Sequence, residues 1–158
     1  MHRHLLRTLL ALVLIACTPL ALAQVEVTGG VSTTRDSQTT GVGSVAWLPE
    51  WREGFGGLLR WEVGAIYVHG RGQTHLDLED NVVVVHGGTR YEHPSGFTHG
   101  FGVGLQVGHT DALSGNPQFV STVGWRWNRF SLLARHISNA SIKQPNDGET
   151  MLVAAWRF

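Results

Sequence analysis

Two side chains near the end of the chain could act together as a base and a nucleophile. His136 and Ser138 stand two positions apart in the stretch RHISNASIKQPNDGET, which covers residues 135–150. Residues at i and i+2 of a β-strand point to the same side, about 7 Å apart along it, so an imidazole can turn onto the hydroxyl. Nucleophilic catalysis needs such a pair, because the imidazole takes the proton of the attacking hydroxyl.

The first residues, MHRHLLRTLLALVLIACTPLALAQ, have the pattern of a secretory signal peptide. A cationic start with Arg3 and Arg7 precedes an apolar run, and the small-residue sequence at 21–23 precedes Gln24. This pattern predicts a leader over residues 1–23 that is removed by cleavage. The sequence LIAC, which ends at Cys17, resembles a lipoprotein processing box and is the alternative.

The remaining chain, residues 24–158, has the length of one domain. The net charge of the full chain is zero and the chain contains no basic block, so nothing indicates nucleic-acid binding. The only cysteine lies in the leader, so no disulfide is expected. No later segment approaches the roughly 18 apolar residues of a membrane helix. A membrane protein with this sequence would have to cross the bilayer as strands.

The chain after residue 23 divides into eight runs with alternating polarity, separated by turn residues. Most runs have about 10 residues, the length of a tilted strand that crosses a bilayer. The predicted strands are Val25 to Thr34, Gln38 to Leu48, Gly56 to Gly70, Asn81 to Glu92, Phe97 to His109, Gln118 to Trp127, Arg129 to Asn139 and Glu149 to Phe158.

The two faces of these strands differ in a way that favours a membrane barrel. Large apolar side chains keep to one face, and glycine, glutamine and charged residues share the other. A soluble barrel hides its apolar face inside, whereas a membrane barrel turns that face to lipid and packs polar residues within. Inward-pointing charges are then expected at Arg60, Glu62, Arg90, Arg126, Arg135 and Arg157. We therefore predict an all-β fold, an eight-stranded antiparallel transmembrane β-barrel; an ordinary sandwich is the alternative.

Aromatic residues gather at one predicted end of the barrel, as in the aromatic girdle at a membrane interface. They are Trp47, Trp51, Phe55, Phe97, Trp125, Trp127, Phe130, Trp156 and the terminal Phe158. With both termini on the periplasmic side, turns are expected near Trp51, at 93–96 and at Asn128. External loops are expected near Asp36 and at 71–80, 110–116 and 140–148.

This arrangement places His136 and Ser138 near the outer leaflet, on the same face of a strand as Phe130 and Leu132. That face meets lipid, while Arg135 points inward. Polar side chains at the edge of the hydrocarbon are costly unless they serve a purpose. A hydrolase that acts on a membrane lipid would need this placement.

The sequences HISNA (136–140) and PNDG (145–148), in a barrel that ends in Phe, resemble the PagL-type outer-membrane lipid A 3-O-deacylases. The two motifs cover about a tenth of the chain. The resemblance implies a serine esterase of the bacterial outer membrane. It would remove the ester-linked 3-hydroxyacyl chain at the 3 position of lipid A, without a cofactor. Its substrate would be lipid A or lipopolysaccharide of the outer leaflet.

The resemblance also implies roles for individual residues. Ser138 would be the nucleophile and His136 its general base. Asn139 and Asn146 match motif asparagines that position the site or contribute to an oxyanion hole. The backbone amides of Ala140 and Ser141 are further candidates for that hole.

The acid of the triad departs from the family pattern. The family glutamate stands two residues after the motif glycine, where this chain has Thr150, and Glu149 is one residue early. Alternation places Glu149 on the inner face. A bulge at Gly148 would turn it outward, so Glu149 is the expected acid; a dyad, or an acid from elsewhere, stays open.

Several alternatives remain at this stage. The histidines show no spacing typical of a zinc site, so no metal is expected. Arg71 in an external loop is a candidate contact for a lipid A phosphate. A non-enzymatic structural or adhesive barrel, or another lipid-acting barrel such as a phospholipase or acyltransferase, fits most of the chain. The oligomeric state, a homodimer included, stays open.

Overall fold

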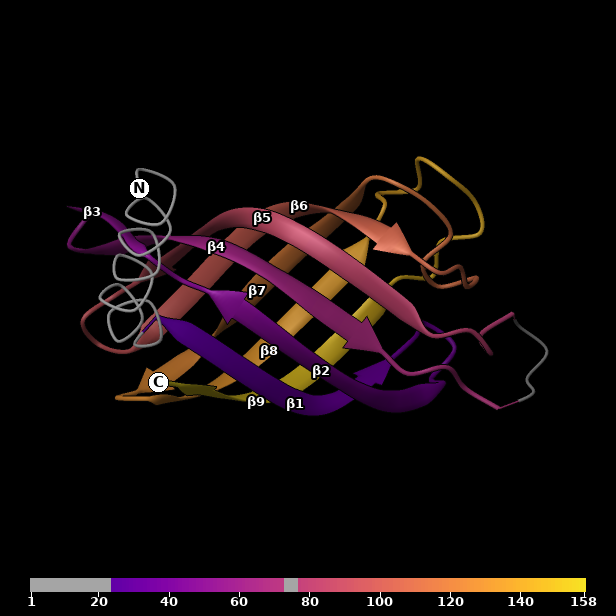
Figure 1. Cartoon of the computed structure of the whole chain (residues 1–158), viewed down its shortest axis with the longest axis horizontal. Coiled ribbons are helices and arrows are strands. Elements are labelled where there is room, and N and C mark those ends of the chain that lie inside the picture. Colours follow the sequence, from indigo (N-terminus) through magenta and orange to yellow (C-terminus); the bar gives the residue numbers. More distant parts are fainter. Residues whose placement is uncertain (1–23, 73–76) are drawn as a thin grey trace, which may run out of the picture.

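The computed structural model describes residues 24–72 and 77–158, which form a closed barrel of tilted antiparallel strands (Figure 1). Strands that follow one another in sequence pair with each other, except β2 and β3; β1 also pairs with β9, and β2 pairs with β4, which closes the barrel. The strands are β1 (Val25–Thr33), β2 (Thr39–Trp47), β3 (Glu50–Gly54), β4 (Gly57–Val68), β5 (Val82–Glu92), β6 (Phe97–Val107), β7 (Gln118–Trp127), β8 (Phe130–Ser138) and β9 (Glu149–Arg157).

Eight of these strands make the barrel wall, as the alternation predicts, and β3 is additional. No helix in the described ranges is long and apolar enough to span a membrane. The predicted leader and Cys17 lie outside the described residues, as do residues 73–76 of one loop.

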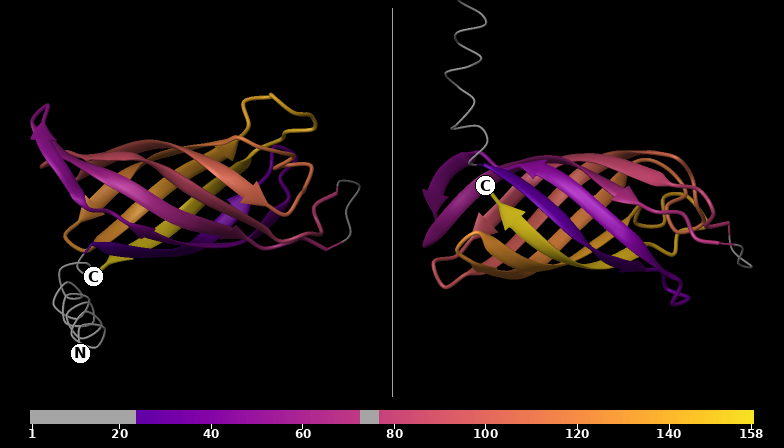
Figure 2. Two further views of the ribbon diagram at one scale, coloured as in Figure 1. Left: turned by 45° about the horizontal axis from the view of Figure 1, so that its top comes forward. Right: turned by 60° about the horizontal axis from the view of Figure 1, so that its bottom comes forward.

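The expected turn near Trp51 is wrong, because the chain forms β3 there. This strand pairs with the start of β4 as a hairpin that extends past the end of the barrel (Figure 2). The turn lies at Phe55 and Gly56, where φ is 54° and 76°, the left-handed values of a type I′ hairpin. Trp51 stacks on Trp61 with ring centroids 4.5 Å apart. The hairpin is therefore anchored to the outside of the wall.

The outer face of the barrel is apolar and the aromatic girdle is present. Side chains along β6, including Phe101 and Leu105, alternate between exposed and buried. Cross-strand neighbours such as Phe97 and Trp125, or Phe130 and Trp156, lie at the end of the barrel where β1 starts and β9 finishes. We call this the short-turn end and the opposite end the long-loop end. Such an apolar band with an aromatic girdle is typical of a membrane barrel.

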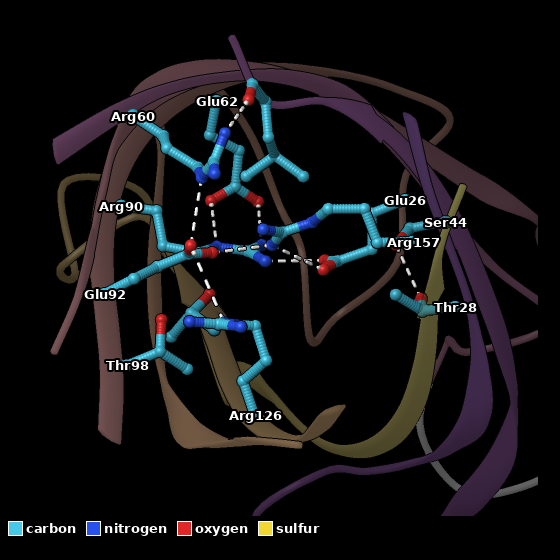
Figure 3. A network of polar contacts seen from close by, with 12 residues as sticks. Glu26, Thr28, Ser44, Arg60, Glu62, Arg90, Glu92, Thr98, Arg126 and Arg157 are labelled. Atoms are coloured by element: carbon cyan, nitrogen blue, oxygen red, sulfur yellow. Dashed lines mark hydrogen bonds and ion pairs between the residues drawn. The ribbon is translucent and has the colours of Figure 1, made fainter. Parts of the chain in front are cut away.

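Buried ion pairs fill the lumen toward the short-turn end (Figure 3). Arg90 lies at their centre, bound to Glu26 at 2.5 Å and to Glu62 at 2.6 Å. Arg157 joins Glu26 at 3.0 Å to Glu92 at 2.7 Å. The predicted inward charges are therefore confirmed, and each is compensated by an opposite charge, as burial requires.

The lumen toward the long-loop end differs from the expectation, because apolar side chains share it with polar and charged ones. Ile66, Leu133 and Ile137 are fully buried there, and Leu113 enters from the loop between β6 and β7. Side chains must fill the interior of an eight-stranded barrel, and apolar ones do so without partners. The wall toward the long-loop end is therefore packed from within.

Candidate active site

β8 presents His136 and Ser138 on the outside of the barrel near the long-loop end. Residues along β8 alternate strictly, so His136 is exposed and Ser138 half-buried while Arg135 and Ile137 are buried. The expectation that the pair shares the outer face is confirmed. In the ladder, His136 lies opposite Ser121 of β7 and Thr150 of β9.

The His136 ring is oriented by a contact at each edge. Its Nδ1 lies 3.0 Å from Oγ1 of Thr150. The other edge lies against Gly148: a Cβ there would be 2.8 Å from Cε1 and 3.2 Å from Nε2. Glu149 pairs with Ile137 in the antiparallel ladder, so Gly148, one residue earlier, lies level with Ser138. The ring therefore leans toward β9, with Cε1 and Nε2 beside Gly148 at the level of Ser138.

Glu149 does not meet His136, so the expected position of the triad acid is corrected. The pairing continues from His136 with Thr150 to Ile137 with Glu149, and no bulge turns the side chain outward. Glu149 is fully buried in the lumen. Its carboxylate binds Arg71 through two bonds of 2.8 and 2.9 Å and accepts a 2.5 Å bond from Ser32.

The same contacts correct the proposed role of Arg71. Its guanidinium points into the barrel, where both terminal nitrogens bind Glu149 and Nε donates to the carbonyl of Gln38 at 3.0 Å. A side chain held in this way is not available to a phosphate outside the wall. Arg71 instead ties the loop after β4 to the β1–β2 hairpin and to β9.

The two motif asparagines fold the loop after β8. The backbone amide of Asn139 donates to Oδ1 of Asn146 at 3.2 Å. The side-chain Nδ2 of Asn139 donates to the Ser114 hydroxyl and to the Lys143 carbonyl. Asn139 is fully buried. These contacts fit a positioning role; because the Asn139 amide is already occupied, they do not favour it as an oxyanion donor.

Ala140 and Ser141 form the turn that follows. Their φ angles are 52° and 61°, and the Ile142 amide donates to the Asn139 carbonyl at 3.1 Å, which defines a type I′ turn. Within the described residues, neither backbone amide of this pair donates a hydrogen bond. Both residues are exposed, so the two amides can meet an anionic oxygen from outside.

The loops at the long-loop end support one another around this site. Gly148 donates its amide to the Ala112 carbonyl at 3.0 Å, and Ser114 donates to the Lys143 carbonyl at 3.3 Å. The loop between β6 and β7 thus packs against the loop between β8 and β9 (Figure 1). Among the residues described, no group of three or more His, Cys, Asp or Glu side chains is arranged for a metal ion.

Comparison with known proteins agrees with this architecture. The family model described as lipid A 3-O-deacylase (PagL) matches residues 39–158. The chain belongs to the PagL family. The crystal structure of the outer membrane enzyme PagL has the same fold at a TM-score of 0.55 and 21% identity, over 84% of this chain and 99% of that chain. No curated protein matches the chain.

Membership of the PagL family and the barrel fold indicate the bacterial outer membrane as the location. Outer-membrane barrels have short periplasmic turns and longer external loops. The short-turn end therefore faces the periplasm. The candidate site of this PagL-family member then lies near the outer leaflet, as the sequence predicts.

Substitution of Gly148 by alanine is expected to displace the imidazole and reduce activity by up to about 100-fold, as misplacement of a catalytic group does. The new Cβ would meet the His136 ring at 2.8 Å, and φ at this position is 71°. Lipid A turnover by the purified variant would measure the effect. Gly56→Ala is the matched control, because φ at Gly56 is 76° and a Cβ there meets nothing within 4 Å. Equal activity of both variants would show that the ring does not need this space.

Sequence reasoning missed the two contacts that orient the imidazole. The sequence places Thr150 on the outer face, at the position where the family acid is absent, and Gly148 at a possible bulge, but it predicts no contact of either residue with the ring. Alternation along β8 and β9 indicates both contacts, because with Glu149 inside it puts Gly148 and Thr150 on the same outer face as His136.

Proposed function

We propose that this protein removes the ester-linked 3-hydroxyacyl chain from the 3 position of lipid A by a serine-esterase mechanism. Ser138 is the nucleophile and His136 the general base. The observation that carries the proposal is their shared position on the lipid-facing side of β8, with the imidazole held between Thr150 and Gly148. Family membership supports the reaction type.

The proposed cycle has two halves. Nε2 of His136 takes the proton from Ser138 as Oγ bonds to the ester carbonyl carbon, and the resulting oxyanion meets the amides of Ala140 and Ser141. The bond from that carbon to the sugar oxygen then breaks, and the imidazolium returns the proton to this oxygen. Water, deprotonated by His136, next attacks the acyl-enzyme. It releases a 3-hydroxy fatty acid and restores the Ser138 hydroxyl.

The location of the pair fits a substrate that arrives within the membrane plane. Phe130, Leu132 and Ala134 lead along the exposed face of β8 toward His136, so an acyl chain can lie against them while its ester reaches the catalytic level. The lumen behind this face is packed with Leu133 and Ile137. Entry from the side needs no channel through the barrel.

Mass spectrometry of lipid A from cells that express the protein tests the proposal. The expected result is loss of one 3-hydroxyacyl chain, with no such loss in cells that express His136→Ala as a folded, heat-modifiable barrel. Unchanged lipid A with a folded wild-type barrel would favour a structural or adhesive protein. Altered phospholipids, or lipid A that gains a chain, would favour a phospholipase or an acyltransferase.

A further inference from the structure

One hydroxyl takes the place in this site that a carboxylate holds in a Ser-His-Asp or Ser-His-Glu triad. In such a triad the acid binds Nδ1 of the histidine, fixes its tautomer and stabilises the imidazolium. Here the group at Nδ1 of His136 is Oγ1 of Thr150, at 3.0 Å. Thr150 is exposed on the outer face of β9, directly opposite His136.

Among the described residues, the neighbours of His136 on the outer face carry no charge that could replace the acid. These neighbours are Ser121, Ala134, Ser138, Gly148 and Thr150. Glu149 lies in the lumen on Arg71.

The loops packed against this edge hold the remaining ionisable groups. Asp147 is half-buried and donates its amide to the Asp111 carbonyl, while Oδ2 of Asp111 accepts the amide of Asp77. The chain of Lys143 lies beside Gly115. No ion pair joins any of these to His136 in the described residues.

We propose that Thr150 is the positioning residue of the active site, accepting the Nδ1 proton of His136 and leaving Nε2 free to act on Ser138. The inference rests on the proposed function, which it deepens. A hydroxyl can fix the tautomer as a carboxylate does, but it brings no negative charge to the imidazolium. A carboxylate at the hydrocarbon edge would need desolvation, and threonine avoids that cost. The site is thus a dyad with a neutral orienting group.

Four variants at two threonines test this role by their pH profiles. Thr150→Val keeps the shape and is expected to lower kcat by about threefold to tenfold, the worth of one neutral hydrogen bond. Thr150→Ser should retain the wild-type rate. Thr150→Glu should raise kcat by about tenfold, since a charge-assisted bond is stronger. It should also move the acid limb of kcat/KM to higher pH, because the carboxylate favours the protonated imidazole. Thr33→Val is the matched control, since Thr33 pairs with Thr150 from β1.

The outcomes separate this inference from the proposed function. Wild-type rate in Thr150→Val, or an unmoved acid limb in Thr150→Glu, would overturn the role of Thr150 while the deacylase activity stands. If the wild-type protein does not act on lipid A, the ¹⁵N chemical shifts of the His136 ring still test whether Thr150 fixes its tautomer. Protonation at Nδ1 that is lost in Thr150→Val supports the inference, and the same tautomer in both proteins refutes it.

Discussion

Replacement of Ser138 by alanine is expected to lower lipid A deacylation by roughly 10³-fold or more, because nucleophilic and general-base catalysis are lost together. The side chain is half-buried on the outer face of β8, so its hydroxyl can be removed without opening the lumen. The barrel should fold and remain heat-modifiable. The measurement is the initial rate of 3-hydroxy fatty acid release from lipid A in mixed micelles.

Ser121 provides a matched control for this prediction. It is also exposed on the outer face, and it lies directly opposite His136 on β7. Ser121→Ala should keep the wild-type rate, because the His136 ring is turned toward Thr150 of β9 and toward Gly148, which directly precedes β9. The reverse result, an inactive Ser121→Ala and an active Ser138→Ala, would make Ser121 the nucleophile.

Removal of one partner from the Arg71–Glu149 ion pair is expected to destabilise the barrel by about 3–5 kcal/mol, because it leaves a buried charge uncompensated. Both side chains are buried, and two hydrogen bonds of 2.8 and 2.9 Å join them. Arg71→Met and Glu149→Gln should each lower the free energy of unfolding, measured by urea titration in detergent or lipid. The double variant Arg71→Met, Glu149→Leu should recover most of the loss.

Two comparisons make this prediction specific. Glu50→Gln at the exposed Arg60–Glu50 pair should change the free energy of unfolding by less than about 1 kcal/mol. The double variant at 71 and 149 should also retain deacylase activity, because Glu149 faces away from His136. A folded double variant as inactive as Ser138→Ala would restore Glu149 as the catalytic acid.

The barrel was predictable because its two faces differ at nearly every position. β8 alternates between buried and exposed residues along its whole length, and the same contrast set the boundaries of most strands. β3 escaped prediction because Glu50, Arg52 and Glu53 follow no apolar period. It is exposed along most of its length and pairs only with β4.

The candidate site was predictable as far as local alternation reaches. Period two placed His136 and Ser138 outside and Glu149 inside, and only the assumed bulge moved Glu149 outward. The partner that holds Glu149 inside, Arg71, is 78 residues away in the chain. Such a contact depends on which loops meet over the lumen, and single-strand patterns carry no information about that. Strand register, which pairs His136 with Thr150, likewise requires the folded barrel.

Covalent labelling of the nucleophile tests the central claim most directly. A lipid-soluble fluorophosphonate should phosphonylate the folded protein, and peptide mass spectrometry should locate the adduct on Ser138. Labelling should slow greatly in His136→Ala, disappear in Ser138→Ala, and block lipid A deacylation in proportion to the adduct formed. An adduct on another residue would contradict the account. So would a loss of deacylation on treatment with the reagent while Ser138 stays unlabelled.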